Sequence, residues 1–205
     1  MNESSTSTEA KAISRRTILL AGALGGASTL LAGCGIGADA AAAGGKRSAS
    51  LYLTIATPAM LGTDDMPAYL PAYPHVPANA TVHVEIMNFD DATALTGGLV
   101  QFAKVKGTVG GTVRVEALNL KDPNAAATAQ VLSELDPQNV SHTFTIAKLG
   151  VNVPVSPKAR TSFVIQTGAP GVFPWRCNDP CGTGASGWGG AMAADRFMMG
   201  KLTVE

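Results

Sequence analysis

The sequence of 205 residues has few aromatic residues, three histidines and no formal net charge. It contains no HExxH or His-x-His cluster, which a catalytic zinc site would need. It also lacks a glycine-rich phosphate loop, and Gly184–Trp188 (GASGW) does not have the spacing of a Gly-x-Ser-x-Gly nucleophile elbow. We therefore expect no catalytic residues and no enzymatic turnover.

A long apolar run is present only near the N-terminus, where it follows a pair of arginines. Residues 1–13 are polar, Arg15 and Arg16 come next, and residues 18–33 are mostly apolar and small. Paired arginines before an apolar run are typical of the twin-arginine export signal. Such a signal predicts a protein that works outside the cytoplasm.

The apolar run ends in Leu-Ala-Gly-Cys at residues 31–34, which resembles the bacterial lipobox. In signals of that family, cleavage falls before the cysteine, whose thiol takes a diacylglycerol. We therefore expect residues 1–33 to be a signal peptide and Cys34 to hold the protein on the extracytoplasmic face of the cell membrane. The alternative is a transmembrane anchor, although the run is a little short for a span of about 20 residues.

The expected mature chain is a tether followed by one domain. Residues 34–50 are rich in Gly, Ala and Ser and lack apolar periodicity, which indicates a flexible tether. Residues 51–205 are enough for one hydrophobic core. Residues 1–33 hold three of the 15 basic and two of the 15 acidic residues, so the remainder has a net charge near −1. That balance gives no support for a nucleic-acid partner.

The pattern of this domain predicts an all-β sandwich. Residues 81–89 (TVHVEIMNF) alternate between apolar and polar side chains, as a half-buried strand does. Residues 112–118 alternate likewise. Other short apolar segments separated by glycine and proline also read as strands; they are residues 51–55, 141–146, 162–167, 172–177 and 199–205.

Two other segments are expected to be irregular. Residues 56–80 contain five prolines and predict a long loop. Residues 125–135 are rich in alanine and follow Asp-Pro-Asn, which suggests a short helix or a loop insertion.

The remaining cysteines, Cys177 and Cys181, form a Cys-x3-Cys pair after a predicted strand. Alternation along that strand places Cys177 on the inward face with Trp175. By the same reasoning His142 shares an inward face with Phe144. Near the C-terminus, Met198 has the same inward parity as Leu202 and Val204. His142, Cys177 and Met198, which are all of residue types that bind metals, are therefore expected to point inward from three strand ends.

These segments resemble the cupredoxin family. The proline-glycine turn, the aromatic strand ending in Cys177 and the closing Met-x-Gly-x-Leu-x-Val strand match its pattern, and His142-x-Phe matches its other ligand-bearing strand. Residues 173–182 are most similar to the dicopper domain of cytochrome c oxidase subunit II, whose ligand loop begins Cys-x3-Cys-Gly. The resemblance covers residues 81–205 and implies a Greek-key β-sandwich with a long insertion, residues 91–141, before the His142 strand.

The resemblance implies a copper site formed by His142, Cys177, Cys181 and Met198. Sulfur ligands favour Cu(I), and imidazole suits both oxidation states of copper. The implied function is electron transfer or Cu(I) holding at the cell surface, with a redox or copper-transfer protein as partner.

The sequence departs from both copper patterns after the second cysteine. Ala185 and Trp188 occupy the positions where the dicopper pattern has histidine and methionine. The mononuclear pattern has a second histidine between its cysteine and its methionine, but none lies between Cys181 and Met198. Within that glycine-rich segment Met192 is the one other possible ligand.

A metal-free protein is the alternative. In an oxidising compartment Cys177 and Cys181 could form a disulfide, leaving a cupredoxin-fold binding module in which His142 is a core-edge histidine. The other two histidines are weaker candidates for ligands. His83 alternates with polar residues, and nothing in the sequence places His75, in the proline-rich segment, near the cysteines.

Overall fold

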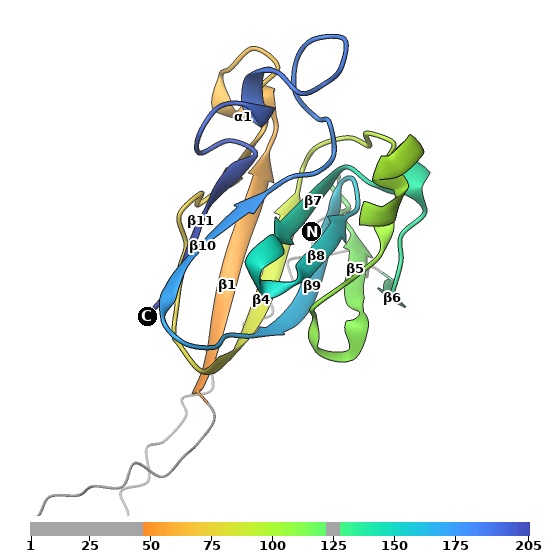
Figure 1. Cartoon of the computed structure of the whole chain (residues 1–205). Coiled ribbons are helices and arrows are strands. Elements are labelled where there is room, and N and C mark those ends of the chain that lie inside the picture. Colours follow the sequence, from red (N-terminus) through yellow and green to blue (C-terminus); the bar gives the residue numbers. More distant parts are fainter. Residues whose placement is uncertain (1–46, 122–127) are drawn as a thin grey trace, which may run out of the picture. The chain divides into compact units, whose positions relative to one another are not determined.

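The computed structural model describes residues 47–121 and 128–205, which form two β-sheets (Figure 1). The predicted signal peptide with Arg15 and Arg16, and the predicted anchor Cys34, lie outside the described residues. Among the residues described, no helix is both long and apolar enough to cross a membrane.

The larger sheet has six strands in the order β2-β1-β4-β9-β5-β6, and the other has five in the order β3-β11-β10-β7-β8. The strands of the first are β1 (Arg47–Ala56), β2 (Ala68–Leu70), β4 (Ala80–Asn88), β5 (Val113–Ala117), β6 (Ala129–Leu132) and β9 (Ala159–Gln166). Those of the second are β3 (His75–Val76), β7 (His142–Ile146), β8 (Val151–Val155), β10 (Gly171–Arg176) and β11 (Met199–Val204). Helical segments are short: α1 (Pro58–Leu61), η1 (Gly97–Ala103), η2 (Val109–Gly111), η3 (Pro137–Asn139), η4 (Ala147–Leu149) and η5 (Gly190–Met192).

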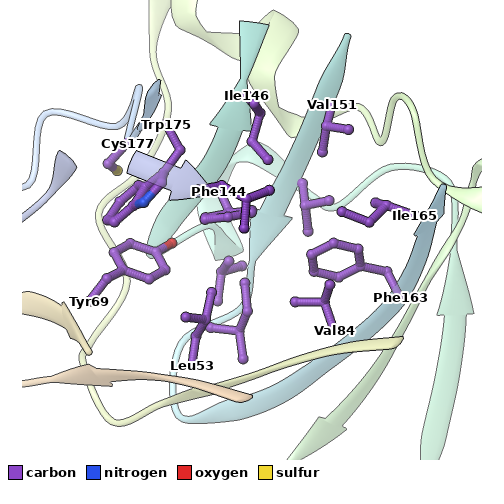
Figure 2. Close-up of a cluster of buried hydrophobic side chains, with 14 of the residues drawn as sticks. Leu53, Tyr69, Val84, Phe144, Ile146, Val151, Phe163, Ile165, Trp175 and Cys177 are labelled. Carbon is purple, nitrogen blue, oxygen red and sulfur yellow. The ribbon is translucent and has the colours of Figure 1, made fainter. Parts of the chain in front are cut away.

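The predicted all-β sandwich is confirmed, and its core is made by the alternating residues of the strands. In β4, Val82, Val84 and Ile86 are buried, whereas His83 is exposed. Apolar side chains from both sheets fill the space between them, and each fully buried aliphatic or aromatic side chain contributes about 1.5–3 kcal/mol. Figure 2 shows this cluster.

One end of the core consists of packed aromatic rings. The ring centroid of Trp175 lies 5.0 Å from that of Tyr69 and 5.4 Å from that of Phe144. The Trp175 indole donates to the carbonyl of Ala72 at 3.0 Å, and the Tyr69 hydroxyl donates to the carbonyl of Thr143 at 3.1 Å. Cys177 lies beside these rings (Figure 2), so its thiol packs against closely packed, hydrogen-bonded side chains.

Three segments that were expected to lack strands contain them. Residues 47–50, expected in the tether, begin β1, because they pair in parallel with residues 80–83 of β4. The expected loop at residues 56–80 contains α1, β2 and β3. Within residues 125–135, where a helix or loop was expected, β6 pairs with β5.

Several strand ends meet at one end of the sandwich. β10 is antiparallel to both β7 and β11, and its last residue, Arg176, pairs with Thr145 of β7 and with Met199, the first residue of β11. The chain that leaves β10 therefore runs toward the first residues of both strands. The long connection between β10 and β11 lies at the same end as α1 (Figure 1). The predicted ligand residues come from these strand ends and from this connection.

Candidate metal centre

Three of the four predicted ligand residues come together. One ligand atom each from His142, Cys177 and Cys181 lies within 4.8 Å of the other two. His142 is the first residue of β7, Cys177 follows β10 directly, and Cys181 lies in the connection to β11. The structure thus supports the inward parity that the sequence predicts for His142 and Cys177, both of which are fully buried.

Backbone hydrogen bonds fix the sulfur of Cys177. The N–H groups of Thr143 and Asp179 donate to Sγ at 3.3 Å and 3.4 Å. The N–H of Cys177 itself donates to the carbonyl of Met198 at 2.8 Å, which ties the sulfur-bearing residue to the start of β11. These N–H groups stabilise negative charge on the sulfur and hold its position.

The two cysteines are free thiols, with their sulfurs 3.6 Å apart. Cys177 is fully buried, whereas Cys181 is partly exposed beside a cavity of about 390 Å³ that Asp65 and Asp90 also line. A sulfur–sulfur bond is about 2.05 Å long, so the pair is close to bonding distance but separate.

Met192, in η5, supplies a third sulfur. Its Sδ lies 3.4 Å from Sγ of Cys181, and its side chain is almost fully buried. Gly182 packs against it: a Cβ there would lie 2.8 Å from Cγ of Met192 and 2.0 Å from the carbonyl oxygen of Gly189. The glycine-rich connection therefore folds tightly enough to bring Met192 to Cys181.

Met198 is buried with Leu202 and Val204, as its parity predicts. The contact that joins it to the centre is made by its backbone carbonyl, which accepts from Cys177. Its role as a ligand stays a prediction, and Met192 is the methionine whose sulfur contacts a cysteine of the centre.

The charges of the centre are coupled. Burial opposes ionisation of Cys177, but its contacts with Cys181 and His142 outweigh burial and lower the pKa of this thiol well below its usual value. The hydrogen bond to Cys177, together with burial, raises the pKa of Cys181. Of the two thiols in the metal-free centre, Cys177 is thus the one that ionises more readily.

His142 carries the balancing positive charge. Burial alone would lower its pKa, yet the hydrogen bond to Asp90 and the nearby Cys177 raise the pKa to about 9. Nε2 lies 3.2 Å from Oδ2 of Asp90, whereas Nδ1 makes no hydrogen bond of acceptable geometry. Because Nδ1 is buried without a hydrogen-bond partner, a metal ion that displaces its proton could bind there.

The other two histidines do not take part in the centre. His83 is exposed on the outer face of β4, and His75 lies in β3, where Nδ1 is 3.0 Å from Oε1 of Glu205. Trp188 lies in the β10–β11 connection and stacks with Arg176, whose guanidinium carbon is 5.7 Å from the ring centroid. Sequence reasoning missed Asp90, because a residue just beyond a strand end has no periodicity to place it.

The donor set fits a soft metal ion. Two cysteine sulfurs, a thioether and an imidazole nitrogen are the ligands that Cu(I) prefers, and cysteine and imidazole together also suit zinc. Thioether sulfur is a ligand for copper rather than zinc, so Met192 favours copper. His142, Cys177, Cys181 and Met192 are the residues that would hold it.

Comparisons with known proteins give low similarities. No family model matches the sequence, and no curated protein sequence matches it. Auracyanin B is 15% identical, with 77% of this chain and 88% of that chain aligned and a TM-score of 0.36. Dithionite-reduced auracyanin from Roseiflexus castenholzii is 14% identical over 78% of this chain and 99% of that chain, with a TM-score of 0.36. Reduced rusticyanin is 16% identical over 78% of this chain and 81% of that chain, with a TM-score of 0.34.

Proposed function

We propose that this chain is a cupredoxin-like copper protein that transfers electrons outside the cytoplasm, held on the membrane by a lipid on Cys34. The observation that carries the proposal is the cluster of His142, Cys177 and Cys181, with two fully buried members and an unpartnered imidazole nitrogen. The resemblance of residues 81–205 to the cupredoxin family supports the same function. Arg15 and Arg16, with the lipobox before Cys34, support the location.

The chain itself supplies three conditions for electron transfer. Burial of His142 and Cys177 excludes water from most of the centre. The N–H groups of Thr143 and Asp179 hold the Cys177 sulfur in place. Trp175 and the other buried rings resist movement of the strand ends. Bound copper would supply the one-electron exchange. Ligands that are held rigidly would lower the reorganisation energy of this exchange.

Two other functions are favoured by particular observations. Among the described residues, the centre offers one histidine and the sulfurs of Cys177, Cys181 and Met192. A donor set rich in sulfur favours Cu(I), and therefore a role in holding this ion. The separation of 3.6 Å between the sulfurs of Cys177 and Cys181 also favours a disulfide in an oxidising compartment. A disulfide would leave a metal-free module that binds a protein partner.

Metal binding by the reduced full chain tests the proposal. We expect one copper per chain by elemental analysis after addition of Cu(I) with excess zinc present, and a sulfur-to-copper charge-transfer band after oxidation. Cys177→Ser should remove both, whereas Cys34→Ser and His83→Ala should keep them.

Reversible oxidation and reduction of the bound copper would indicate electron transfer. Loss of copper on oxidation, with a Cys177–Cys181 disulfide, would indicate Cu(I) holding, and no retained copper would overturn the proposal.

The two buried methionines provide a matched pair of variants. Both Met192→Leu and Met198→Leu keep a buried apolar side chain, a change that typically costs less than about 1.5 kcal/mol of stability. We expect Met192→Leu to change the visible spectrum and to weaken Cu(I) binding, because its sulfur contacts Cys181. Met198→Leu should do neither. The reverse result would assign the fourth ligand to Met198.

A further inference from the structure

Asp90 makes a direct contact with the imidazole of His142. It lies two residues beyond β4, and its Oδ2 is 3.2 Å from Nε2 of His142. The His142 ring is fully buried, so this carboxylate replaces the water that would otherwise bind Nε2. The other ring nitrogen, Nδ1, is the one left for a metal ion.

The carboxylate of Asp90 is itself held in place. The N–H of Asp91 donates to its other oxygen, Oδ1, at 3.0 Å, and its own N–H donates to the side chain oxygen of Asn88, also at 3.0 Å. The Asn88 amide in turn donates to the carbonyl of Ser156 at 2.9 Å, and the N–H of Lys158 donates to the carbonyl of Asp90 at 3.1 Å. With Oδ1 already bonded, Oδ2 is the oxygen directed to His142.

Such an arrangement has a defined effect on a metal ligand. A carboxylate that accepts from one imidazole nitrogen keeps the proton on that nitrogen, so the opposite nitrogen presents its lone pair. The carboxylate also makes the imidazole a stronger donor. A stronger nitrogen donor stabilises Cu(II) more than Cu(I), because Cu(I) depends more on sulfur.

We infer that Asp90 is the positioning residue that fixes His142 for metal binding through Nδ1 and lowers the reduction potential of the bound copper. This inference rests on the proposed copper site. Asp90 is not itself one of the donors, yet it would set the orientation of His142, the one imidazole ligand of the site.

Three variants of the full chain test the role of Asp90. Asp90→Asn keeps an oxygen acceptor without the charge, and Asp90→Ala removes both. Asp91→Asn is the matched control: it removes one negative charge from the neighbouring residue, whose exposed carboxylate pairs with Lys158 and not with His142. The measurements are the copper content, the visible spectrum and the midpoint potential, with circular dichroism to show that each variant is folded.

We expect Asp90→Ala to weaken Cu(II) binding by about 10- to 100-fold, the usual effect of removing such a partner. The loss for Cu(I) should be smaller. Each tenfold difference between the two losses corresponds to an upward shift of about 59 mV in a one-electron potential. Asp90→Asn should shift the potential in the same direction but by less, and Asp91→Asn should leave it close to that of the unchanged protein.

Equal potentials for the Asp90 and Asp91 variants would overturn the inference. A separate readout does not need copper: in the metal-free, reduced protein, the Nε2–H of His142 should give a slowly exchanging signal in nitrogen-15 NMR spectra. That signal should disappear in Asp90→Ala and persist in Asp91→Asn. If the unchanged protein shows this signal but binds no copper, the proposed function fails while the hydrogen bond to Asp90 stands. If the signal survives in Asp90→Ala, the role of Asp90 itself is wrong.

Discussion

Asp179 lies between the two cysteines in sequence and is fully buried, with no hydrogen-bond partner for either carboxylate oxygen. Burial and, after it, the neighbouring Cys177 raise its pKa to about 8. In an unfolded chain the pKa of an aspartate is about 3.9. A carboxyl group whose pKa is raised on folding stabilises the fold below its unfolded pKa, and this contribution is lost as the pH rises through the folded value.

Asp179→Asn should therefore remove part of the pH dependence of stability in the metal-free, reduced protein. Between pH 5 and pH 8, the unchanged protein should lose at least about 1.4 kcal/mol more unfolding free energy than the variant, the equivalent of one pKa unit. Urea unfolding at several pH values measures this difference. The buried amide has a cost of its own, but that cost does not vary with pH. Asp64→Asn, at an exposed site, is the control, and parallel pH curves for Asp179→Asn and the unchanged protein would contradict the prediction.

The residues of the candidate site differ in how far the sequence could predict them. His142 and Cys177 occur in or next to regular strands, where alternation shows which side chains face inward. Met192 could not be preferred over Met198, because it lies in a glycine-rich segment without periodicity, whereas Met198 precedes a regular strand. Asp90 and His142 are 52 residues apart, and only the packing of the two sheets brings them together.

At the scale of elements, the β10–β11 connection is the part that most directly shapes the site. It folds back on itself through hydrogen bonds from Gly182 to Gly187 at 2.8 Å and from Thr183 to Gly189 at 3.1 Å. A Cβ at Gly182 would lie within 3.0 Å of two backbone oxygens and of Cγ of Met192. The close approach of the backbone therefore requires glycine at this position.

Gly182→Ala should displace the connection and with it Met192. Overpacking of this kind costs about 1–3 kcal/mol, and each 1.4 kcal/mol spent on moving Met192 away weakens metal binding about tenfold. We expect weaker Cu(I) binding in competition with a chelator, with the far-ultraviolet circular dichroism unchanged. Gly168→Ala, where a Cβ meets nothing within 4 Å, should bind as the unchanged protein does. Equal affinities for the two variants would show that the connection does not position a ligand.

The strands show the same division between regular and irregular sequence. Those with clear alternation, such as β4, agree with the prediction to within a residue at each end. β3 and β8 escaped prediction because they are short or contain proline: β8 includes Pro154, and β3 has two residues. β6 is an edge strand with exposed residues such as Val131, so it lacks the apolar face that marks a strand.

At the scale of the whole molecule, the candidate site and the start of the described chain lie at opposite ends of β1. Arg47 pairs with Ala80, the first residue of β4, whereas Ile55 pairs with Asn88, two residues before Asp90. A strand of this length, 10 residues, spans about 30 Å. Pro58, in α1 just beyond β1, lines the same cavity as Cys181.

This arrangement predicts that lipid attachment leaves the site open to soluble partners. In cells that export the protein, a labelled fatty acid should attach to the unchanged chain and not to Cys34→Ala. The copper form of the lipid-bearing protein in vesicles should then react with a soluble, bulky inorganic oxidant at a rate close to that of the lipid-free variant. A large decrease in the rate on vesicles would mean that the site faces the bilayer.

The length of β1 also separates the candidate site from the side of the domain at which the described chain begins. The distance along this strand is about 30 Å. The proposed carrier, held by a lipid on Cys34, would move sideways along the membrane and meet its partners by diffusion in two dimensions, without being released from the surface.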